Sequence, residues 1–133
     1  MSARILLVED NATNRYLATY LLEQCGFTVS HAANGEEAVE RTLANPPDLV
    51  LMDLQMPKMD GFEAARRIKA EANLRHIPLV ALTSYAMVGD RDRALAAGFA
   101  GYIEKPITTE TFAAEVEKHL SLAGNPPNIL QKP

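Results

Sequence analysis

Five residues with charged or hydroxyl side chains each follow a short apolar run of the sequence: Glu9, Asp10, Asp53, Thr83 and Lys105. Carboxylates packed close together repel one another unless a cation lies between them. Mg²⁺ suits such a set, because it prefers oxygen ligands, keeps several of its waters and bridges to phosphate oxygens. The residue types therefore favour phosphoryl chemistry over a metal-free acid–base pair.

The other members of the set can assist the transfer of a phosphoryl group to a carboxylate. An aspartate nucleophile that forms an acyl phosphate is a known covalent strategy. The ammonium group of Lys105 would neutralise charge that builds on the transferred group, and the Thr83 hydroxyl could donate to one of its oxygens. The set thus contains candidates for a nucleophile, for cation ligands and for groups that stabilise a phosphoryl group.

These five residues meet only if the apolar runs before them are neighbouring strands. Apolar runs of strand length occur at residues 5–8, 49–52, 77–82 and 101–104, and the first two indicate buried strands. Residues 27–31 alternate between apolar and polar side chains, which predicts a fifth strand at a sheet edge. Helical patterns follow the strands at residues 13–25, 34–43, 62–72, 87–97 and 108–122.

Five strand–helix units in a row predict an α/β fold, a doubly wound parallel sheet with helices on both faces and right-handed crossovers. In such an open sheet, ligands bind beyond the carboxyl ends of the strands. The order of the sequence alone therefore sends three carboxylates, a hydroxyl and an ammonium group to one edge of the fold.

Local signals place the ends of several helices. Asn34, with Glu37 three residues later, is typical of a helix N-cap, and Asp60 with Gly61 predicts a turn that opens the third helix. The first helix is followed by Gly26, a stop signal. It carries four large apolar residues at helical spacing: Tyr16, Leu17, Tyr20 and Leu21.

The composition suits one soluble domain. The chain has 133 residues and a net charge of −4, which argues against a nucleic-acid partner because phosphate backbones attract clustered Lys and Arg. No apolar run approaches the ~18 residues that a membrane span needs. Cys25 is the single cysteine, which excludes an intramolecular disulfide and fits the reducing cytoplasm.

Four motifs in order give the chain a resemblance to a known family. They are ILLVED at residues 5–10, LMDLQMPKMDG at 51–61, ALTS at 81–84 and YIEKP at 102–106. With these motifs the chain resembles the receiver domain of two-component response regulators, over roughly residues 4–122. We therefore expect residues 1–122 to form the receiver domain and residues 123–133 to be a tail or linker.

The resemblance implies a fold and a set of site residues. The family's fold is flavodoxin-like, with five helices and strand order 2-1-3-4-5. Asp53 would be the phosphoacceptor, and Thr83 and Lys105 would contact the phosphoryl group. Mg²⁺ would be held by Glu9, Asp10, Asp53 and the backbone carbonyl of Gln55. Thr83 and Tyr102 would form the switch that responds to phosphorylation.

The resemblance also implies a signalling role. A histidine kinase or a phosphotransfer protein would donate the phosphoryl group, and a downstream effector protein would bind the face of helix four, strand five and helix five. The protein would be a self-phosphorylating and self-dephosphorylating switch rather than a turnover enzyme, as a monomer or weak dimer. A receiver that is one part of a hybrid kinase or a multidomain regulator is the alternative context.

A nucleotide-binding enzyme of similar fold fits the sequence poorly. A dinucleotide-binding protein needs glycines after its first strand, so that backbone N–H groups can approach the pyrophosphate. Residues 9–14 here read EDNATN, with two acids and no glycine. The two carboxylates would repel a pyrophosphate.

Overall fold

The computed structural model describes residues 3–54, 59–83, 90–104 and 112–122. These residues form a five-stranded parallel sheet in the order β2-β1-β3-β4-β5. Its strands are β1 (Arg4–Val8), β2 (Thr28–Ala32), β3 (Leu49–Asp53), β4 (Leu79–Thr83) and β5 (Gly101–Glu104). The predicted doubly wound sheet and its strand order are confirmed.

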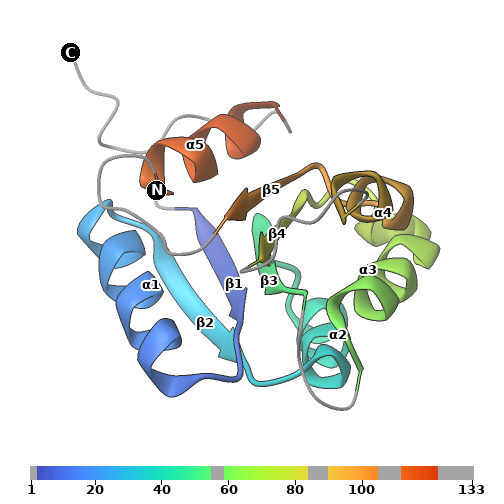
Figure 1. Cartoon of the computed structure of the whole chain (residues 1–133), viewed down its shortest axis with the longest axis horizontal. Coiled ribbons are helices and arrows are strands. Elements are labelled where there is room, and N and C mark those ends of the chain that lie inside the picture. Colours follow the sequence, from blue (N-terminus) through green and yellow to red (C-terminus); the bar gives the residue numbers. More distant parts are fainter. Residues whose placement is uncertain (1–2, 55–58, 84–89, 105–111, 123–133) are drawn as a thin grey trace.

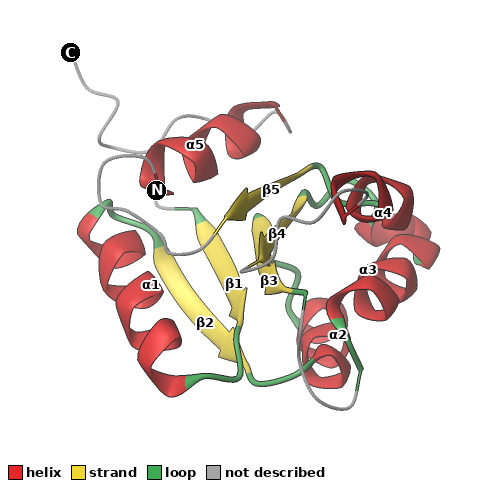
Figure 2. Cartoon of the chain, viewed as in Figure 1, coloured by secondary structure: helices red, strands yellow, loops and turns green. Residues whose placement is uncertain are grey.

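Helices cover both faces of the sheet, as Figure 1 shows. They are α1 (Ala12–Gln24), α2 (Gly35–Ala44), α3 (Gly61–Ala70), α4 (Asp90–Ala97) and α5 (Phe112–Leu122), drawn in red in Figure 2. A short 3₁₀ helix, η1 (Ala72–Leu74), follows α3. Two apolar cores result: one lies between the sheet and α2, α3 and α4, the other between the sheet and α1 and α5. No helix of the described residues combines the length and apolar character that crossing a membrane requires.

Alternating side chains of the central strands feed the two cores. In β1, Leu6 and Val8 join the core under α2, α3 and α4, whereas Ile5 and Leu7 join the core under α1 and α5. All five residues of β3 are buried. The edge strand β2 is mostly exposed, as its alternating sequence predicts.

The chain departs from the predicted bounds on both sides of η1. The third helix ends at Ala70 rather than Ala72, because Glu71 has an extended backbone with φ −86° and ψ 116°. The fourth strand begins at Leu79 rather than Ile77. Pro78 has no N–H to donate, but its carbonyl still accepts a hydrogen bond of 3.0 Å from the Val50 N–H.

The helix α1 is confirmed, but of the four large apolar residues predicted on it only Leu21 packs against the core, and it does so partly buried. Tyr16 is 75% exposed, Tyr20 51% and Leu17 43%, whereas Ala18 and Leu22 are buried. The small Ala18 lets the helix lie close to the sheet, and Leu22 one turn later fills the space between them. The two tyrosines are therefore left on the outer surface of α1.

The predicted N-cap of α2 is also confirmed, and it yields a test. Asn34 Oδ1 accepts a hydrogen bond of 2.8 Å from the Glu37 N–H, and Glu37 Oε1 accepts one of 3.0 Å from the Ala33 N–H. Asn34→Ala should lower the free energy of unfolding by about 1 kcal/mol, because the cap interaction is lost. Urea titration followed by circular dichroism measures this difference.

Asn14→Ala is the matched control, because Asn14 is exposed inside α1 and alanine is the better helix former. Its free energy of unfolding should stay the same or rise. Equal losses in the two variants would show that the Asn34 cap contributes nothing of its own.

Candidate functional site

Two neighbouring strands bring the three predicted carboxylates together. Glu9 and Asp10 directly follow β1, and Asp53 is the last residue of β3, whose Met52 pairs with Val8. One carboxylate oxygen from each acid lies within 4.8 Å of the other two. The sheet register therefore produces the acidic cluster that the sequence predicts.

The three acids differ in their exposure to solvent. Glu9 is 2% exposed and Asp53 is 7% exposed, whereas Asp10 lies on the surface. A donor set of oxygens alone, with one side open to water, fits a hard divalent cation that retains part of its hydration shell. The acidic cluster therefore fits the Mg²⁺ site that the family resemblance implies.

Several hydrogen bonds fix the loop between β1 and α1. The Glu9 N–H donates to the Ala32 carbonyl of β2 at 3.1 Å, and the Asn11 N–H donates to Glu9 Oε2 at 3.3 Å. Asn11 is the N-cap of α1, since its Oδ1 accepts from the Asn14 N–H at 2.9 Å. Glu9 and Asp10 are thus held between the end of a strand and a capped helix.

Arg15 is a contact of this loop that the sequence does not reveal. Its Nη1 donates to the backbone carbonyl of Glu9 at 2.9 Å, and its side chain is half-buried. A side chain that binds a carbonyl six residues earlier leaves no periodic or motif signal.

The polar residues that end β3 and β4 lie at the same edge. Asp53 pairs with Leu82, and Thr83, the next residue of β4, is 1% exposed. Tyr102 in β5 is half-buried and packs against the core under α2, α3 and α4. The predicted ligand Gln55 and the predicted phosphoryl contact Lys105 lie outside the described residues.

Gly61 packs against the backbone of Asp53. Its N–H donates to the Leu54 carbonyl at 3.2 Å, and a Cβ atom at Gly61 would lie 2.7 Å from the Asp53 carbonyl oxygen. The preceding residue, Asp60, caps α3 by accepting from the Glu63 N–H at 3.0 Å. The predicted turn at Asp60 and Gly61 is confirmed, and it brings the start of α3 close to the acidic cluster.

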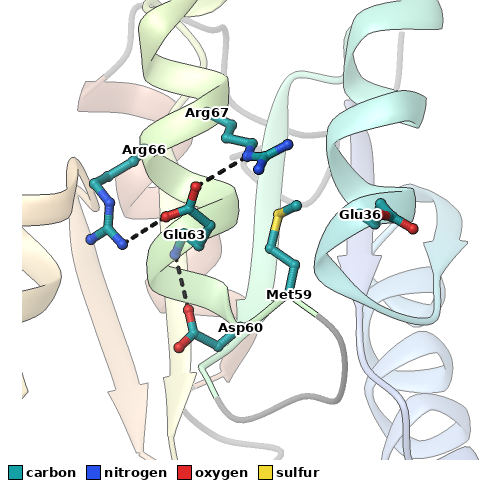
Figure 3. Close-up of a pocket in the computed structure, with 6 residues that line it drawn as sticks. All are labelled: Glu36, Met59, Asp60, Glu63, Arg66 and Arg67. Carbon is teal, nitrogen blue, oxygen red and sulfur yellow. Dashed lines mark hydrogen bonds and ion pairs between the residues drawn. The ribbon is translucent and has the colours of Figure 1, made fainter.

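A polar groove of about 620 Å³ lies between α2 and α3, beside this turn (Figure 3). It is lined by Glu36, Met59, Asp60, Glu63, Arg66 and Arg67. Glu63 forms ion pairs with Arg66 at 2.9 Å and with Arg67 at 3.1 Å, and these hydrogen bonds lower the pKa of its carboxyl group. The three clustered acids do not line this groove, so it is separate from the candidate site.

The fold and the acidic cluster together define a receiver domain. The family model of the response regulator receiver domain matches residues 5–117. The chain therefore belongs to the response regulator receiver domain family, which acts in two-component signalling.

Individual relatives fit this family. The chain is 38% identical over 120 residues to the polar-differentiation response regulator DivK of Brucella anthropi, and the match covers 90% of this chain and 98% of that protein.

A second relative is the receiver domain of the sensor histidine kinase PA1611 from Pseudomonas aeruginosa, 35% identical, with a TM-score of 0.85 and coverage of 91% and 99%. Its crystal structure has a magnesium ion coordinated in the active site cleft. A putative response regulator from Chloroflexus aurantiacus has a TM-score of 0.87 at 26% identity, with coverage of 91% and 99%. The similar proteins thus include both response regulators and a receiver domain of a kinase.

Proposed function

We propose that Asp53 accepts a phosphoryl group from a histidine kinase or a phosphotransfer protein, with Mg²⁺ bound at the acidic cluster. The observation that carries this proposal is the approach of the Glu9, Asp10 and Asp53 carboxylate oxygens to within 4.8 Å of one another. The magnesium ion in the cleft of the related Pseudomonas aeruginosa receiver supports the choice of cation.

In the proposed reaction a carboxylate oxygen of Asp53 attacks the phosphorus atom of the donor. The new bond joins that oxygen to phosphorus, the bond from phosphorus to the donor imidazole nitrogen breaks, and the electron pair stays on the imidazole. Bound Mg²⁺ would supply positive charge to the phosphoryl oxygens. Glu9 and Asp10 would hold the cation beside Asp53, together with the Gln55 carbonyl.

Thr83 and Lys105 would then contact the phosphoryl group on Asp53. An aspartyl phosphate is more anionic than aspartate and offers additional acceptor oxygens, so it would draw the Thr83 hydroxyl toward it. Tyr102 would move inward in response and remodel the face of α4, β5 and α5, where an effector protein binds. We propose a cytoplasmic switch of this kind, which modifies itself and does not turn over a substrate.

A labelling experiment with a small acyl phosphate tests this function. The chain should take up one phosphoryl group in the presence of Mg²⁺, through a bond that base cleaves, and chelation of the metal should prevent the uptake. Uptake that is equal with and without a chelator would contradict the proposed role of Mg²⁺.

The exposed tyrosines of α1 give a prediction about the phosphoryl donor. Tyr16 and Tyr20 stand on the helix that begins directly beside the acidic cluster, and tyrosines are enriched where proteins bind one another. Replacing both by serine should slow transfer from a phosphohistidine protein about 10-fold, a usual size for the loss of an aromatic contact. Transfer from a small acyl phosphate should stay unchanged, because that donor needs no contact with α1.

Leu43→Ser is the matched control, since Leu43 is an apolar side chain of α2 that is 47% exposed. It should leave both donors unaffected. A tyrosine variant that loses activity equally with the protein and the small donor would show that Tyr16 and Tyr20 do not serve donor binding.

A further inference from the structure

The arginine of α1 that reaches back to the end of β1 has no role in the function proposed above. Arg15 Nη1 donates a hydrogen bond of 2.9 Å to the Glu9 carbonyl, in the peptide that joins Glu9 to Asp10. This peptide connects two of the three clustered carboxylates. A contact to its oxygen therefore acts on the orientation of both side chains.

The backbone of Glu9 is held from two directions. Its N–H is bound to the Ala32 carbonyl of β2 at 3.1 Å, which continues the pairing of β1 with β2. Its carbonyl accepts a hydrogen bond from the guanidinium of Arg15, a residue of α1. Removal of Arg15 would take away the side-chain donor to the carbonyl of the Glu9–Asp10 peptide, and this peptide could then rotate more easily.

The backbone of Arg15 is fixed in the first turn of α1. The side chain is half-buried, and the Arg15 N–H donates to the Asn11 carbonyl at 2.9 Å in the first turn of the helix. Burial lowers the pKa of His31 on β2, and the positive charge of Arg15 lowers it further. The side chain of Arg15 thus extends from α1 toward the end of β1 and lies near His31 of the edge strand β2.

We propose that Arg15 is a positioning residue for the metal site, which fixes the Glu9–Asp10 peptide so that both carboxylates face Asp53. This inference rests on the proposed function, because it concerns Mg²⁺ at the acidic cluster. Substitution of an outer-shell group that orients metal ligands typically lowers metal affinity about 10- to 100-fold.

The positive charge of Arg15 and its positioning of the ligands would have opposite effects on Mg²⁺ affinity. The direction in which the affinity changes when Arg15 is replaced therefore distinguishes the two. A guanidinium cation near three carboxylates repels a second cation, so its removal through charge alone would tighten Mg²⁺ binding. A guanidinium that orients the ligands would weaken Mg²⁺ binding when it is removed. A role in folding alone would lower the melting temperature and leave the affinity of the folded protein unchanged.

The test is a Mg²⁺ titration of the unphosphorylated chain, followed by amide chemical shifts, with circular dichroism as the check on folding. Arg15→Met should raise the Mg²⁺ dissociation constant roughly tenfold. Arg15→Lys keeps a hydrogen-bond donor and the positive charge, so its Mg²⁺ dissociation constant should rise less. Arg15→Gln keeps a neutral donor and should also show a smaller rise. The glutamine variant replaces the methionine variant in the test if Arg15→Met does not fold.

Arg41→Met is the matched control. Arg41 forms an ion pair with the exposed Glu37 at 3.3 Å. Its positive charge also lowers the pKa of His31, although by less than burial and the charge of Arg15 do. Its Mg²⁺ affinity should equal that of the unchanged protein. Equal or tighter binding by folded Arg15→Met would overturn the inference alone. An unchanged protein that does not bind Mg²⁺ would overturn the proposed function and this inference together.

Discussion

Asp10→Asn should reduce Mg²⁺-dependent phosphorylation at least about 100-fold. The substitution removes the negative charge of the exposed member of the carboxylate cluster but keeps its shape. Glu9 and Asp53 alone would hold the cation weakly, and Asp53 would face the anionic donor without the neutralising charge. The measurement is the initial rate of phosphoryl uptake from a small acyl phosphate over a range of Mg²⁺ concentrations.

Asp92→Asn is the control for this experiment, because Asp92 is an exposed acid on α4, outside the cluster. It makes the same change of charge and should leave the Mg²⁺ dependence unaltered. Asp92→Asn should keep the melting temperature of the unchanged protein, because Asp92 is exposed. Asp10→Asn should not lower the melting temperature, because it removes a repelling charge from the carboxylate cluster. If the Asp10→Asn titration matched that of the unchanged protein, Asp10 would not be a ligand of Mg²⁺.

Gly61→Ala should lower the free energy of unfolding by about 1–2 kcal/mol, although alanine is the better helix former by about 1 kcal/mol. The added Cβ would lie 2.7 Å from the Asp53 carbonyl oxygen and 3.0 Å from Leu54 Cα, and both are backbone atoms. The loop must therefore move away from the start of α3. Because this movement displaces Asp53 itself, phosphorylation at saturating Mg²⁺ should also slow down several-fold.

Ala70→Ser is the matched control, since it adds one heavy atom to the exposed last residue of the same helix. Denaturant titration and uptake of the phosphoryl group are measured for both variants. A Gly61→Ala protein as stable and as active as the unchanged chain would show that the close approach of α3 to Asp53 is not needed.

The parts of the fold that the sequence predicts are those set by a strong periodic pattern. Continuous apolar runs indicate buried strands, and their alternation with helical patterns leaves few topologies beyond a parallel sheet. The carboxyl ends of β1 and β3 then lie side by side, which brings Glu9, Asp10 and Asp53 together. The acidic cluster was predictable because its residues stand at, or directly after, the carboxyl ends of strands.

Other features depend on contacts that periodicity does not encode. The outward position of Tyr16 and Tyr20 follows from the small Ala18, which lets α1 approach the sheet on another side. The early end of α3 depends on the extended backbone of Glu71. The bond from Arg15 to the Glu9 carbonyl joins a side chain to a backbone atom, and such a contact has no counterpart in residue types.

The measurement that tests the central claim most directly identifies the residue that carries the phosphoryl group. Reduction of an aspartyl phosphate with borohydride gives homoserine, which mass spectrometry of the digested protein locates in the sequence. We predict homoserine at position 53 after treatment with an acyl phosphate and Mg²⁺, and none when the metal is chelated. Homoserine at position 10 or 60, or a labelled protein without homoserine, would contradict the assignment of Asp53 as the acceptor.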